Sequence, residues 1–283
     1  MREAGARHGH RTRLWQPDGR LAGIARIVIL CAGIAGLTPA SAARAAPELA
    51  EPPVALAWST EEIDEATRDN AAPVLDQARR RDQFGCRRHC ELLQQVFDRL
   101  VARAREDSPR AARIDWRLSV VRGDAVEAMA LPGGHVIVSE SFIDESVPGE
   151  DALAFVLAHE MAHSILEHER QALTYARMLL PRQVPRTVAD VYVEIDHNLG
   201  LLKAMEPVMQ QGELEADELG LLLAASAGHD PQHQVDFLRR AVDRGEPRRA
   251  LVQTHPALAD RLARLEARLP LAARLHRQAL DER

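Results

Sequence analysis

The most constraining stretch of this chain is LAFVLAHEMAHSILEHE, which runs from Leu153 to Glu169. Its apolar residues lie on almost every side of a helix, which is typical of a segment buried in a protein core. The same stretch carries His159, Glu160 and His163 in the pattern H-E-x-x-H. Burial of such polar side chains costs free energy unless they are paired or bind a metal. The fold must therefore provide partners for these three side chains.

The spacing of these residues suits a zinc site. On a helix, His159 and His163 lie one turn apart and point the same way, so their imidazoles can bind one zinc ion. Glu160 lies about 100° around the helix, where it can reach a zinc-bound water without being a ligand. The positions at which some zincins carry a glycine and a third histidine hold Leu166 and Glu169 here. We therefore expect the helix to continue and the third ligand to come from another helix.

The stretch GELEADELG at 212–220 is the candidate for that second helix. Glu213 and Asp217 are four residues apart and hence on one helical face. We predict that Glu213 completes a His-His-Glu site and that Asp217 accepts the free N–H of a zinc-bound imidazole. Glu215 points about 200° away from Glu213, so it is a poorer ligand candidate. The alternative for the stretch is a solvated acidic start of a helix.

Four stretches, in this order along the chain, resemble the M48 peptidases, a group of zincins, and above all their small exported bacterial members. They are ALPGGHVIVSESFID (130–144), LAHEMAH (157–163), GELEADELG with AGHDP (212–220 and 227–231), and THPALADRL (254–262). The resemblance implies an α+β, mostly helical fold of the zincin metallopeptidase type, with a small β-sheet beside the H-E-x-x-H helix. It also implies one Zn²⁺ per chain, bound by His159, His163 and Glu213, with Glu160 as the catalytic base.

The same resemblance leaves the role of His255 open. In some members the histidine of the T-H-P stretch approaches the zinc, where it either closes off the site or stabilises the oxyanion. The alternative is that Thr254, His255 and Pro256 merely begin a helix.

The stretch GGHVIVSE reads as a strand that forms the edge of the substrate cleft. We predict that Gly133, Gly134, His135 and Val136 bind an extended peptide, with main-chain hydrogen bonds giving affinity but little sequence preference. Such a site suits unfolded polypeptides. The resemblance to exported M48 members implies a zinc-dependent endopeptidase acting on unfolded or misfolded envelope proteins in protein quality control. The alternative is a latent or chaperone-like zinc-binding assembly factor in the cell envelope. An aminopeptidase is disfavoured because we find no G-x-M-E-N stretch.

The first 45 residues have the layout of a cleaved secretory signal, with an arginine-rich start, a short apolar run at 27–37 and small residues that allow cleavage. We therefore expect an exported, periplasmic protein. Without this segment the net charge changes from −6 to −11, and an acidic chain argues against nucleic acid as a partner. Apolar residues in 164–212 suggest core or lid packing, with peripheral membrane contact as the alternative.

We predict a linker at 46–57, an N-terminal helical region at 58–110 and an M48-type metallopeptidase domain at 111–283. After signal removal, Cys86 and Cys90 are the remaining cysteines. An even number of cysteines in an exported protein favours a disulfide, and a spacing of four residues on a helix lies near the upper end of the bridgeable range. A zinc site that includes His89 is the weaker alternative.

Overall fold

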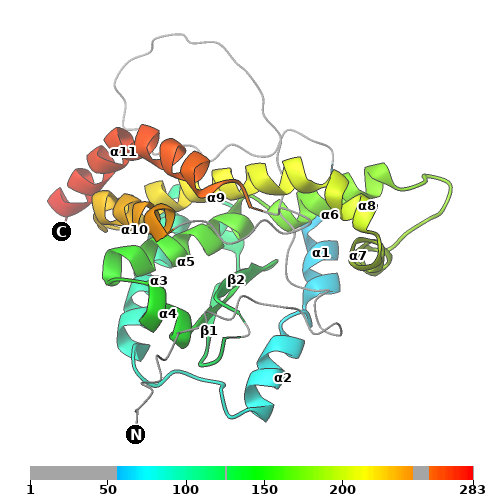
Figure 1. The fold of residues 1–283 in the computed structure, drawn as a ribbon, viewed down its shortest axis with the longest axis horizontal. Coiled ribbons are helices and arrows are strands. Elements are labelled where there is room, and N and C mark those ends of the chain that lie inside the picture. Colours follow the sequence, from blue (N-terminus) through cyan, green and yellow to red (C-terminus); the bar gives the residue numbers. More distant parts are fainter. Residues whose placement is uncertain (1–55, 125, 245–254, 283) are drawn as a thin grey trace, which may run out of the picture.

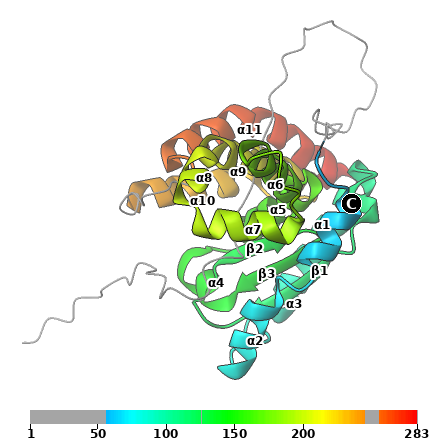
Figure 2. The ribbon, with the colours of Figure 1, turned by 90° about the vertical axis from the view of Figure 1, so that its right-hand side faces the viewer.

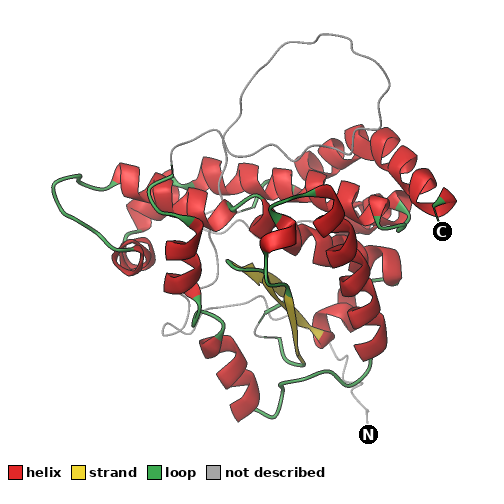
Figure 3. Cartoon of the chain, turned by 180° about the vertical axis from the view of Figure 1, so that it is seen from behind, coloured by secondary structure: helices red, strands yellow, loops and turns green. Residues whose placement is uncertain are grey.

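The computed structural model describes residues 56–124, 126–244 and 255–282. Helices surround one small sheet, so the predicted α+β, mostly helical fold is confirmed (Figures 1 and 3). The predicted signal peptide and most of the predicted linker lie outside the described residues. Among the described helices, none is long and apolar enough to cross a bilayer.

The sheet contains β1 (Arg117–Val121), β2 (Ala128–Leu131) and β3 (His135–Ser139) in the order β1-β3-β2. Strand β3 is parallel to β1 and antiparallel to β2. The turn between β2 and β3 needs glycine, because Gly134 has a φ of 85° and a Cβ there would lie 2.2 Å from the Cγ2 of Ile114. This glycine therefore serves the turn and its packing.

The prediction that GGHVIVSE forms the edge of the cleft is wrong. Strand β3 is the central strand, and both of its sides are paired with neighbouring strands. Val136 is fully buried in the core, and the imidazole Nε2 of His135 lies 2.9 Å from the Ser119 hydroxyl on β1. The edge strand that packs against the H-E-x-x-H helix is β2.

Several helical segments in the first half of the chain lie around this sheet (Figure 2). They are α1 (Thr60–Thr67), α2 (Ala72–Arg80), α3 (Cys90–Asp107), the 3₁₀ turn η1 (Ala111–Arg113) and α4 (Glu140–Ser146). Helix α1 begins with a capping box between Ser59 and Glu62. Cys86 and Cys90, the first residue of α3, form a disulfide with their Cα atoms 5.6 Å apart. Helix α3 shares one hydrophobic core with β3 and the H-E-x-x-H helix.

Two long helices form the centre of the molecule: α5 (Glu150–Ile165), which carries H-E-x-x-H, and α9 (Glu206–Ser226), which carries GELEADELG. They approach closely where Gly220 meets the backbone of α5. A Cβ on Gly220 would lie 2.9 Å from the amide nitrogen and 3.0 Å from the Cα of His159. Helix α11 (Leu258–Asp281) packs along α9, and α10 (Pro231–Arg244) contacts α5, α9 and α11 (Figure 1).

The expectation that the H-E-x-x-H helix continues beyond the motif is wrong. Helix α5 ends at Ile165, and a two-residue turn leads into α6 (His168–Leu179). The turn contains Glu167 in the left-handed region, with φ 53° and ψ 36°. The chain continues through α7 (Val188–His197) and α8 (Leu199–Ala204), which share a second apolar cluster with α1 and the start of α9.

We expect Gly220→Ala to lower the free energy of unfolding by about 1–3 kcal/mol, because the added methyl group meets backbone that cannot move independently of α5. Urea unfolding followed by circular dichroism measures this loss. The control is Gly200→Ala in α8, whose nearest neighbour is the side-chain oxygen of Asn198 at 3.3 Å; its stability should stay within about 1 kcal/mol of wild type. Equal stabilities of both variants would contradict the close contact between α5 and α9.

Candidate metal centre

Three side chains from α5 and α9 converge on one point. The two Nε2 atoms of His159 and His163 are 3.1 Å apart. The carboxylate of Glu213 places one oxygen 3.8 Å from the first of these nitrogens and the other oxygen 3.6 Å from the second. Ligands about 2.0–2.1 Å from a tetrahedral zinc ion lie about 3.3 Å apart, so the three donors fit such an ion. The structure thus brings together the three residues predicted as metal ligands.

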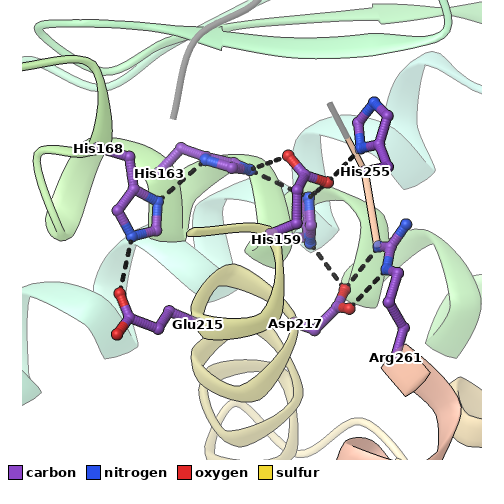
Figure 4. Close-up of polar contacts among 8 residues, drawn as sticks. His159, His163, His168, Glu215, Asp217, His255 and Arg261 are labelled. Carbon is purple, nitrogen blue, oxygen red and sulfur yellow. Dashed lines mark hydrogen bonds and ion pairs between the residues drawn. The ribbon is translucent and has the colours of Figure 1, made fainter. Parts of the chain in front are cut away.

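His159 is oriented from behind by a carboxylate. Its Nδ1 lies 3.0 Å from Oδ1 of Asp217, so its Nε2 faces the cluster. Asp217 also accepts two hydrogen bonds of 2.7 Å from the guanidinium of Arg261 on α11 (Figure 4). Burial acts to raise the pKa of Asp217, but Arg261 outweighs it and the pKa lies below its ordinary value. The carboxylate therefore stays charged beside the imidazole, as predicted for an outer partner of a metal ligand.

His163 has a different partner. Its Nδ1 lies 3.1 Å from the Nδ1 of His168, and Nε2 of His168 lies 3.4 Å from a carboxylate oxygen of Glu215. Burial, together with the neighbouring His159, holds the pKa of His163 well below its ordinary value. His163 is therefore neutral at pH 7, which is the form that binds metals.

Glu160 lies on the β2 side of this cluster. Burial raises the pKa of its carboxyl, while His159 and the backbone N–H of Ala130 on β2 oppose the shift. The group is thus held at the edge strand, beside the donors but outside their set. A carboxyl with a raised pKa next to a metal site is suited to exchange protons near neutral pH.

His255 contacts the carboxylate of Glu213. The distance between its Nδ1 and Oε2 of Glu213 is 2.6 Å, and about half of the imidazole is exposed. Burial acts to raise the pKa of Glu213, but the hydrogen bond from His255 and the nearby imidazoles hold it well below its ordinary value. His255 is therefore beside the candidate ligands, from a segment remote in sequence.

A second group of potential ligands in the described part of the chain consists of Cys86, Cys90 and Glu140. The two sulfur atoms are joined in a disulfide, which removes them as ligands. The carboxylate of Glu140 accepts hydrogen bonds from the backbone N–H groups of Arg87 and Arg88, at 2.8 and 2.6 Å. The disulfide and the Glu140 carboxylate therefore stabilise the chain at the start of α3. The weaker alternative of a zinc site that includes His89 finds no support, because that imidazole pairs with Asp144.

The profile of peptidase family M48 matches residues 88–269. The chain belongs to this family. The M48 match includes α5, α9 and the first half of α11, and hence the three candidate ligands together with Arg261.

Named relatives are similar over the same part of the chain. Mitochondrial metalloendopeptidase OMA1 of Schizosaccharomyces pombe is 33% identical over 175 residues, which are 59% of this chain and 50% of that protein. Metalloendopeptidase OMA1 of Homo sapiens is 29% identical over 189 residues, or 60% of this chain and 35% of that protein. The beta-barrel assembly-enhancing protease of Yersinia pestis is 27% identical over 181 residues, or 59% of this chain and 36% of that protein. The chain thus spans half or less of the length of these relatives.

Sequence reasoning missed two residues of this centre. Arg261 lies in the THPALADRL stretch, but nothing in its local pattern indicates that it reaches Asp217 on another helix. His168 lies one residue before the position at which some zincins carry a third histidine, so the motif assigns it no role. Its position behind His163 depends on the turn at Leu166–Glu167, which no glycine or proline marks. The signal that could have found His168 is its distance of five residues from a ligand, provided that the helix breaks between them.

We expect Arg261→Met to lower the free energy of unfolding by about 3–5 kcal/mol, because it leaves the fully buried carboxylate of Asp217 without its cation. Thermal and urea unfolding measure the change. The control is Arg264→Met on the same helix, which removes an exposed ion pair with Glu218 and should cost about 1 kcal/mol or less. Similar losses in the two variants would contradict a special role for the buried pair.

Proposed function

We propose that this chain is a zinc-dependent endopeptidase that hydrolyses peptide bonds within unfolded polypeptides. The observation that carries the proposal is the convergence of His159, His163 and Glu213, with Glu160 on the same helix as the two histidines. A zinc ion in this site supplies a Lewis acid for the scissile carbonyl and lowers the pKa of bound water. We propose one zinc ion per chain.

Glu160 is proposed to move the proton in this reaction. Its carboxylate accepts the proton of the attacking water and then donates it to the leaving amine. The raised pKa of Glu160, caused first by burial, favours this exchange near neutral pH. The backbone N–H of Ala130 keeps the carboxylate oriented beside the edge strand.

The outer edge of β2 is proposed to bind the substrate, in place of β3. The amide of Ser139 donates to the carbonyl of Glu127, which makes this a hydrogen-bonded pair of the β2–β3 ladder. Because such pairs alternate along antiparallel strands, the backbone groups of Ala128 and Ala130 face away from β3. The N–H of Ala130 is taken up by Glu160, but an extended peptide can pair with the backbone groups of Ala128 and with the carbonyl of Ala130, and so run past Glu160. Main-chain pairing gives little sequence preference, which suits unfolded chains.

The site of action is proposed to be the cell envelope, with misfolded proteins there as substrates. Two features support this: the signal-like first 45 residues, and the similarity to a protein named beta-barrel assembly-enhancing protease. We also propose that the protein contacts a membrane surface. The support for this contact is a set of exposed apolar side chains on and between α6, α7 and α8, namely Met178, Leu179, Val184, Val193 and Leu199.

We expect Glu160→Gln to lower kcat for casein cleavage by about 10²–10⁴-fold, because the amide cannot accept the proton of water. Zinc content should stay at the wild-type value, since Glu160 lies outside the donor set. The control is Glu150→Gln at the exposed start of the same helix, which should keep full activity. Chelation should abolish wild-type cleavage, and added Zn²⁺ should restore it. Cleavage that survives both chelation and Glu160→Gln would disprove the proposal.

A second candidate function is a latent or chaperone-like zinc protein. The observation that favours it is the 2.6 Å contact between His255 and Glu213, because this imidazole engages an oxygen that is also needed for zinc binding. In this case the wild-type protein does not cleave casein, and the His255→Ala variant does. If His255 instead stabilises the oxyanion, wild type is active and His255→Ala lowers kcat with little change in zinc content.

A further inference from the structure

A second buried histidine stands behind one of the candidate ligands. His168 is completely buried, and its Nδ1 lies 3.1 Å from the Nδ1 of His163, on the side opposite to the converging donors (Figure 4). Its other nitrogen, Nε2, lies 3.4 Å from an oxygen of Glu215, whose side chain is about one-third exposed. The three side chains form a row that leads from the metal centre to the protein surface.

This row depends on the interruption of the helix. On a continuous helix, a residue five positions after His163 would point about 140° away from it. The turn at Leu166–Glu167 ends α5, and α6 begins at His168. The imidazole of His168 is thereby brought back against His163, at hydrogen-bond distance.

The turn is held by a dedicated set of contacts. Glu167 has a φ of 53°, a conformation that residues other than glycine adopt rarely. Its buried carboxylate accepts a hydrogen bond of 2.6 Å from the Thr60 hydroxyl and two of 2.9 Å from Arg170, and it pairs with Arg110. A strained residue that is fixed from several elements is typical of a functional position.

The hydrogen bonds of the row allow one arrangement of hydrogens when a metal is bound. If Nε2 of His163 is a ligand, its Nδ1 carries the hydrogen and donates it. The Nδ1 of His168 must then accept, so the hydrogen of His168 is on Nε2 and is donated to the carboxylate of Glu215. The hydrogen-bond partners along the row are thus compatible with a metal bound to Nε2 of His163.

We propose that His168, oriented by Glu215, is a positioning residue that fixes the tautomer and the ring orientation of His163 for metal binding. The inference rests on the proposed metal site. The two candidate histidine ligands then have different hydrogen-bond partners. His159 contacts the charged carboxylate of Asp217, which pairs with Arg261, whereas His163 contacts a neutral imidazole. The neutral partner orients His163 without adding a negative charge next to it.

The test measures zinc affinity of the full chain by competition with a chromophoric chelator. We expect His168→Leu to weaken zinc binding by about 10–100-fold, the usual effect of removing an outer partner of a ligand. The control is His229→Leu, which removes another buried histidine that contacts Asp151 and lies outside the row; its zinc affinity should equal that of wild type. Unfolding of the metal-free variants reports stability separately from metal binding.

Two amide variants keep the test decisive if His168→Leu fails to fold. In His168→Asn the amide oxygen takes the place of Nδ1 and accepts from His163, so zinc affinity should stay within about threefold of wild type, well short of the loss caused by removing the partner. In His168→Gln the amide reaches the place of Nε2 and leaves His163 without an acceptor, so affinity should fall. Equal affinities of the Asn and Gln variants would overturn the inference. A wild-type chain that binds no zinc would instead contradict the proposed function itself.

Discussion

The close packing of α5 against α9 is the contact on which the rest of the structure depends. Gly220 allows the two helices to meet over the backbone of His159, where any side chain would hold them apart. At this separation, the face of α9 that carries Glu213 and Asp217 reaches the face of α5 that carries His159 and His163. Each helix supplies a pair of residues one turn apart, so a single contact between helices aligns two candidate ligands with a third candidate and with the carboxylate of Asp217.

Burial of so many polar groups requires that each has a partner. The chain meets this requirement with helices that lie outside the central pair. Arg261 on α11 compensates Asp217, and His255, just before α11, contacts Glu213. On the opposite side, Glu167 joins the end of α5 to Thr60 of α1 and to Arg110 near η1. The surrounding helices therefore complete the centre as well as covering it, which explains why the metallopeptidase fold is mostly helical around a very small sheet.

The sequence was sufficient for those parts of the centre that depend on local periodicity. The spacing of four residues in His159/His163 and in Glu213/Asp217 defines a helical face without knowledge of the fold. The order of the strands could not be obtained in this way, because alternation identifies a strand but not its neighbours. For this reason the prediction of β3 as an edge strand is wrong. The break before His168 was missed because tertiary contacts of Glu167, and no local breaker residue, produce it.

The position of Arg261 has a consequence for how the centre is assembled. This arginine follows its partner Asp217 by 44 residues along the chain. When the polypeptide is synthesised from its N-terminus, both histidines and both carboxylates emerge before the guanidinium of Arg261. Until α11 docks, burial of Asp217 is unfavourable, and the four groups stay hydrated. Docking of α11 is therefore the step that allows these four groups to leave water together.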